Sequence, residues 1–139
     1  MTVSLSELAA NVQLTALSRL FDGGFLRVYT GPRPQSPDEP INEQRLLAEV
    51  RFSSPAFRKP KNGYVRSREI EPDPHAAPEG DGEASWYRVF AADGETALID
   101  GTVGTHDADM LVSSTTIQRS AKFSIMEYRL RPSHVVFHE

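Results

Sequence analysis

A helix pattern that gives way directly to a strand pattern is the feature that most constrains this fold. Apolar residues recur every three to four positions, and this spacing predicts a helix over residues 5–21 with one apolar face. That face comprises Leu5, Leu8, Val12, Ala16 and Leu20. Gly23 or Gly24 can take the left-handed conformation that ends a helix. Residues 25–30 contain β-branched and aromatic side chains, so they predict a strand directly after the turn.

Short strand patterns dominate the rest of the chain. Alternating apolar residues predict a strand at residues 46–52, and an Asp-Gly turn predicts a hairpin between strands at 86–91 and 96–103. Further strands are expected at 64–66, 110–113, 115–118 and 122–130. Successive strands without intervening helices are typical of an antiparallel sheet. The sequence therefore predicts a single domain over residues 1–139, a mainly antiparallel β-sandwich or flattened barrel of six to eight strands with one N-terminal helix.

Two charged segments interrupt the β domain of residues 25–137, and both are expected to be loops. The first covers residues 31–42 and contains Pro32, Pro34, Pro37 and Pro40, which remove backbone donors and hold the chain extended. The second covers residues 58–83. Within it, residues 71–83 are rich enough in proline, glycine and acids to form a mobile excursion. Both loops are candidates for contacts with neighbouring molecules.

Charge is segregated around the second loop, although the net charge of the chain is only -4. Basic residues occur without an acid at Arg51, Arg58, Lys59, Lys61, Arg66 and Arg68. Acidic residues then occur without a base at Glu69, Glu71, Asp73, Glu79, Asp81 and Glu83. Two solvated loops that partly neutralise each other would explain this pattern. The alternative is docking, in which the basic arm of one copy meets an acidic surface on a neighbour.

The docking alternative defines a set of candidate interface residues. They are Arg58, Lys59, Lys61, Arg66, Arg68, Glu69, Glu71, Asp73, Pro32 and Pro34. The basic run contains few aromatic residues for base stacking, and the chain is acidic overall, so a nucleic-acid partner is not expected. No apolar run approaches the ~20 residues that span a bilayer, so a membrane partner is not expected either.

The sequence contains no pattern that indicates catalysis or a cofactor. The absence of cysteine excludes disulfides and thiolate chemistry. Neither a Gly-x-Ser-x-Gly elbow nor a phosphate-binding glycine loop occurs. His106, Asp107 and Asp109 could ligate a divalent cation, but an exposed polar turn explains the same residues. We therefore expect no enzyme, no cofactor and no metal site.

Apolar residues on the later strands identify candidate core positions. Trp86 and Phe90 share one side of their strand and Tyr87 lies on the other, so we expect Trp86 and Phe90 to face the core. The C-terminal residues 133–139 are apolar enough to complete the sheet of their own copy or to add a strand to a neighbour.

Four blocks of sequence carry a resemblance to a known family. They read FLRVYTGPRP at 25–34, LLAEVRFSSPAF at 46–57, ASWYRVF at 84–90, and DGTVG with ADM at 100–104 and 108–110. In this order the blocks resemble a family of small virion-associated proteins of tailed phages and prophages. The resemblance covers roughly residues 5–130. It implies a particle component that is made in the bacterial cytoplasm, and it carries no catalytic residues.

We therefore expect a structural protein of a tailed-phage particle, either a capsid decoration or stabilising protein or a neck or tail accessory protein. Its partners would be other virion proteins and copies of itself, contacted through the loops at 31–42 and 58–83. Two alternatives come from different classes. A host-surface module that binds a glycan or receptor would show aromatic residues at a loop tip, and a small wall hydrolase would show a cleft with paired carboxylates or a metal.

Overall fold

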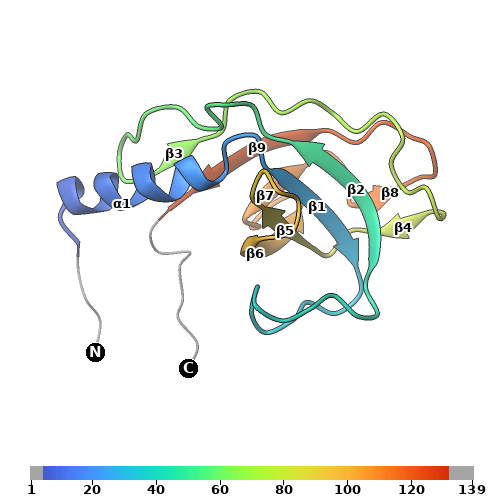
Figure 1. Ribbon diagram of the computed structural model, residues 1–139. Coiled ribbons are helices and arrows are strands. Elements are labelled where there is room, and N and C mark those ends of the chain that lie inside the picture. Colours follow the sequence, from blue (N-terminus) through green and yellow to red (C-terminus); the bar gives the residue numbers. More distant parts are fainter. Residues whose placement is uncertain (1–4, 132–139) are drawn as a thin grey trace.

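The computed structural model describes residues 5–131 and is mostly β with one helix (Figure 1). Helix α1 spans Glu7–Leu20. The strands are β1 (Phe25–Thr30), β2 (Arg45–Arg51), β3 (Val65–Arg66), β4 (Gly82–Glu83), β5 (Trp86–Phe90), β6 (Ala97–Gly104), β7 (Met110–Val112), β8 (Thr116–Ile117) and β9 (Ile125–Leu130). The strand expected from residues 133–139 lies outside the described residues.

The strands form a seven-stranded sheet in the order β2-β1-β5-β6-β7-β9-β3 and a two-stranded sheet of β4 and β8. Neighbours run antiparallel except β6 and β7, which are parallel. The sheet is therefore mixed, and it is not closed into a barrel, so the flattened barrel is wrong. In the turn between these parallel strands, the Asp109 carboxylate accepts hydrogen bonds from the Thr102 backbone and hydroxyl, which tie the turn to β6.

Residues 67–77 lie between β2 and the chain that leads into β9. The backbone of Asp73 exchanges two hydrogen bonds with that of Phe123, at 2.9 and 2.8 Å. The Asp73 carboxylate also accepts a hydrogen bond from the backbone N–H of Glu49 in β2, at 3.1 Å. Ala76 and Ala77 are fully buried in the core. This segment therefore joins two distant parts of the large sheet.

The expectation of a charged loop at residues 58–83, with a mobile excursion at 71–83, needs correction. The range contains β3 and β4, and β4 pairs with β8. The backbone N–H of Ala77 also donates to the carbonyl of Leu47, which lies in β2. Small alanine side chains allow this close approach to the core, although proline and acidic residues surround them in sequence.

Strand β5 is buried on both faces, and its orientation differs from the sequence prediction. Tyr87 and Val89 belong to the main core. Trp86 and Phe90 are also buried, but they lie on the opposite face of the sheet, where Trp86 stacks on Tyr29 at a ring-centroid distance of 4.7 Å. Alternation alone could not distinguish the two faces, because each of them is covered.

The central hydrogen bond of the core joins two tyrosines. The Tyr87 hydroxyl donates to the Tyr128 hydroxyl at 3.0 Å, and the two rings pack edge to face. Burial raises the pKa of Tyr87 and Tyr128 above the ordinary value of 10.0, and the neighbouring Tyr87 raises that of Tyr128 further. Both phenols therefore stay neutral in the folded chain at pH values where the unfolded chain would begin to ionise.

Alkaline pH is expected to destabilise this protein through the tyrosine pair. Because the pKa of each phenol is higher in the folded chain, its burial adds in full to the free energy of unfolding below about pH 10. This contribution is lost as pH rises towards the folded pKa, by about 1.4 kcal/mol per pH unit for each phenol. Urea unfolding measured from about pH 9 to about pH 11 should show a steeper decline for the natural chain than for a Tyr87→Phe/Tyr128→Phe variant. Equal slopes would contradict this account.

Helix α1 buries a different face from the one predicted. Ser6 is its N-cap and accepts a hydrogen bond from the backbone N–H of Ala9, at 3.1 Å. Ala10 and Leu14 are buried, and Leu17 packs against the core. The expected core face points outward, with exposed fractions of 51% at Leu5, 74% at Leu8, 61% at Val12 and 54% at Leu20.

The reason for this reversal lies at the end of the helix. Phe21 follows α1 directly and is fully buried, with ring-centroid distances of 5.5 Å to Phe52 and 5.3 Å to Phe57. Aromatic residues bury the largest apolar areas, so the helix turns the side that continues into Phe21 towards the core. That choice leaves the other apolar face of α1 in solvent.

Candidate docking surface

Residues 56–68 form a hairpin, here called the basic hairpin, that lies next to α1. At its tip, Asn62 and Gly63 have φ values of 56° and 78°, the left-handed conformation that a type I′ turn needs at both central positions. Lys61 and Tyr64 pair on either side of this turn. The Asn-Gly dipeptide flanked by paired residues therefore explains where the chain reverses.

The register of the basic hairpin places three arginines on one side. Phe57 pairs with Ser67, and the backbone N–H of Arg58 donates to the carbonyl of Arg66 at 2.9 Å. Arg58 and Arg66 are therefore direct cross-strand neighbours, and Arg68 lies two residues further along the same face. Phe57 points the other way and is buried. Like charges directly opposite each other destabilise a strand pair, so the hairpin does not gain stability from this arrangement.

The cations of the basic hairpin are exposed and largely without acidic partners. Arg66 pairs with Glu127 at 3.5 Å. Within residues 5–131, Arg58 and Arg68 make no ion pair, and neither do Lys59 and Lys61. The positive charge extends onto the end of β9, where Arg129 and Arg131 lie over the Tyr64 ring at 4.8 and 5.7 Å.

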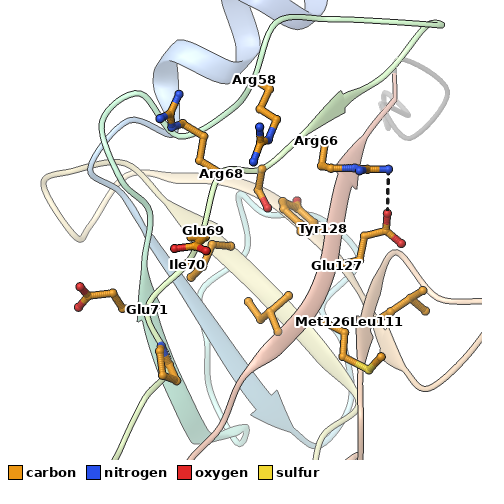
Figure 2. A pocket seen from close by; sticks show the side chains of 13 residues that line it. Arg58, Arg66, Arg68, Glu69, Ile70, Glu71, Leu111, Met126, Glu127 and Tyr128 are labelled. Carbon is orange, nitrogen blue, oxygen red and sulfur yellow. Dashed lines mark ion pairs between the residues drawn. The ribbon is translucent and has the colours of Figure 1, made fainter.

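A pocket of about 640 Å³ opens between the basic hairpin and β9 (Figure 2). The three arginines lie along one side, whereas Leu111 and Met126 lie on the other, with Tyr128 between them. Met126 is 69% exposed. Glu69 and Glu71 line the same pocket, but neither forms an ion pair with an arginine of the described chain. The pocket thus combines three arginines and an apolar side with three carboxylates, of which that of Glu127 pairs with Arg66.

The structure brings together only part of the predicted interface. Arg58, Lys59, Lys61, Arg66, Arg68, Glu69 and Glu71 lie on or beside the basic hairpin. Asp73 instead has a structural role, because its carboxylate accepts hydrogen bonds from the backbone N–H groups of Glu49 and His75. Pro32 and Pro34 lie in the β1–β2 loop, which is well apart from β3 (Figure 1).

A buried ion pair, which sequence reasoning missed, holds the β1–β2 loop. The Arg88 guanidinium donates to both carboxylate oxygens of Asp100, at 2.7 and 3.0 Å. It also donates to the carbonyls of Glu39 and Ser36 in the loop, at 2.7 and 3.2 Å. The side chains are only 3% and 1% exposed. Nothing in the WYRVF pattern marks this arginine, because alternation alone does not reveal what covers a face.

Two of the three residues considered for a metal site make other contacts in the structure. The Asp109 carboxylate is bound to Thr102, and the exposed His106 lies 3.1 Å from the Thr105 hydroxyl. Across residues 5–131, no group of three or more histidine, aspartate or glutamate side chains is placed to hold a metal ion. The turn therefore has a structural explanation in the chain itself.

No family model, curated protein or solved structure matches this chain. In the described part of the chain, no helix is long and apolar enough to cross a membrane. The geometry of the basic hairpin and its surroundings is therefore the main structural guide to function.

Proposed function

We propose that this protein is a structural component of a tailed-phage particle and that it docks onto a neighbouring virion protein through the basic hairpin. One observation carries the docking role: three arginines share one face of the hairpin, and Arg58 and Arg68 have no acidic partner in the described chain. Charge that costs stability in the isolated chain is explained if a partner supplies the acids. The resemblance of four sequence blocks to virion-associated proteins supports the particle as the assembly.

Within the particle, the proposed roles are capsid decoration or a neck or tail accessory. Both need a compact domain that attaches to other virion proteins by a defined surface. The apolar side of the pocket, formed by Leu111 and Met126, would add buried area to the charged contacts. The arginines would then set orientation and association rate more than affinity.

Neutralising two hairpin arginines should weaken incorporation into particles. An Arg58→Gln/Arg68→Gln variant should remain folded because both side chains are exposed, and it should lose about tenfold in attachment. Attachment should also become less sensitive to salt. Quantitative mass spectrometry of particles purified at two salt concentrations measures both effects.

The matched control removes two exposed cations elsewhere, in an Arg119→Gln/Lys122→Gln variant. This variant lowers the net charge by the same amount and should incorporate like the natural chain. If both double variants attach equally well at both salt concentrations, the basic hairpin is not the docking surface.

A further inference from the structure

A second groove lies between the basic hairpin and α1, and Arg58 and Arg68 line both this groove and the pocket beside β9. The volume of the groove is about 910 Å³. Val12 and Ala16 of α1 line one side, and Pro55, Phe57 and Pro60 line the other. The groove is therefore bordered by apolar side chains from two elements that are far apart in sequence.

The exposed face of α1 continues this apolar border. Leu8 lies one helical turn before Val12, so the two side chains are neighbours on the helix surface. Their exposed fractions are 74% and 61%. Single exposed apolar residues are ordinary on protein surfaces, but a row of them beside a groove is typical of an interaction site.

Positive charge surrounds the groove. Arg19 in the last turn of α1 lines it together with Arg58, Lys59 and Arg68. None of these four forms an ion pair within the described residues. The acid in the lining is Asp22, whose carboxylate accepts a hydrogen bond from the backbone N–H of Ala56 at 2.7 Å. The surrounding cations therefore favour an occupant that brings its own carboxylates.

The combination of charge and apolar surface selects among the possible occupants. A second copy docked through the same face would place like charges against each other, which costs energy. A nucleic acid would use the cations but would leave Leu8 and Val12 in water. An amphipathic helix with acidic flanks satisfies both, because its apolar face covers the exposed residues while its carboxylates reach the arginines and Lys59.

We infer that the groove between α1 and the basic hairpin is a docking site for an acidic amphipathic helix of a partner protein. This inference rests on the proposed function, since it names the chemistry of the virion partner. The apolar side chains of that helix pack on Leu8, Val12 and Ala16, and its carboxylates lie against Arg19, Arg58 and Arg68.

The test uses a synthetic peptide of about five helical turns, with leucines along one face and glutamates on its flanks. Fluorescence anisotropy with the full chain should show binding that weakens at least about tenfold in a Leu8→Gln/Val12→Gln variant and about tenfold in Arg58→Gln/Arg68→Gln. The Arg119→Gln/Lys122→Gln variant, which removes two exposed cations outside this groove, should bind normally. A peptide with lysines in place of the glutamates should bind far more weakly.

Four outcomes would overturn the inference. Equal binding of the glutamate and lysine peptides would show that charge does not select the occupant. Equal binding of the glutamate peptide to the natural chain and to Leu8→Gln/Val12→Gln would show that the exposed face of α1 does not take part. Tighter binding of a DNA duplex than of the glutamate peptide would assign the surface to nucleic acid. Self-association of the natural chain that Leu8→Gln/Val12→Gln abolishes, measured by sedimentation, would assign it to a second copy.

Particle incorporation separates this inference from the proposed function. If the natural chain is in the particles and Leu8→Gln/Val12→Gln is incorporated equally, the groove is not used and the structural role stands. If the natural chain is absent from particles, the structural role fails regardless of how the peptide binds.

Discussion

Replacing Asp100 with alanine should lower the free energy of unfolding by about 3–5 kcal/mol, because it leaves the buried Arg88 guanidinium without its carboxylate. Arg88 is 3% exposed and Asp100 1%, so water cannot replace the lost partner without local unfolding. The β1–β2 loop should loosen as well, since Arg88 holds the carbonyls of Ser36 and Glu39. Urea denaturation measures the first effect, and hydrogen exchange of the loop measures the second.

Two comparison variants make this result specific. Glu95→Ala removes an exposed carboxylate and should change the free energy of unfolding by less than about 0.5 kcal/mol. Arg88→Met/Asp100→Leu removes both charges together and should recover part of the loss, because no unpaired charge stays buried. A loss below about 1 kcal/mol in Asp100→Ala would contradict the account of the pair.

Replacing Phe57 with alanine should cost about 3–5 kcal/mol, the usual range for removing a buried phenylalanine. The ring packs against Phe21, Phe52 and Tyr128 at centroid distances of 5.3, 5.9 and 6.1 Å, so its loss leaves a cavity among aromatic side chains. Phe57 is also the core contact of the basic hairpin. Thermal or urea unfolding should show the loss of stability directly.

The same substitution should disturb docking in a chain that is still folded. Without its core contact, the hairpin no longer holds its arginines in one arrangement, and attachment to particles should fall. Lys59→Ala, two residues away and exposed, should leave the free energy of unfolding within about 0.5 kcal/mol of the natural value. Unchanged stability in Phe57→Ala would show that the hairpin is not packed on the core as described.

Local patterns predicted the regular elements well. The helix expected at residues 5–21 is α1 at Glu7–Leu20, and the Asp-Gly hairpin is confirmed as β5 and β6. These features depend on spacing and turn chemistry, which are readable within a few residues. The parallel pairing of β6 with β7 comes with hydrogen bonds from Thr102 to the Asp109 carboxylate, and no short-range pattern predicts that pairing.

The errors arise where two apolar faces compete or where both faces are covered. Two apolar rows lie along α1, and Phe21 decides which of them is buried. Trp86 and Tyr87 are both buried on opposite sides of β5, because the β1–β2 loop covers the outer face. Residues 71–83 had the composition of a loop, and the contacts of Ala76 and Ala77 could not be read from it.

The candidate site was only partly readable from sequence. The run of bases between Arg58 and Arg68 stands out by charge, and the Asn-Gly turn within it could have predicted a hairpin. Cross-strand register then places the arginines on one face. Asp73, Pro32 and Pro34 were grouped with them by sequence proximity or loop composition, and the structure places them elsewhere. The groove beside α1 depends on which helix face is buried, so the sequence pattern did not reveal it.

The copy number of this chain in purified particles is the decisive measurement for the proposed structural role. Quantitative mass spectrometry should compare it with the major capsid protein and with neck and tail proteins. The account predicts a defined number: one close to that of the capsid protein would indicate decoration, and one close to that of neck or tail proteins would indicate an accessory role. Absence of the chain from purified particles would contradict the claim.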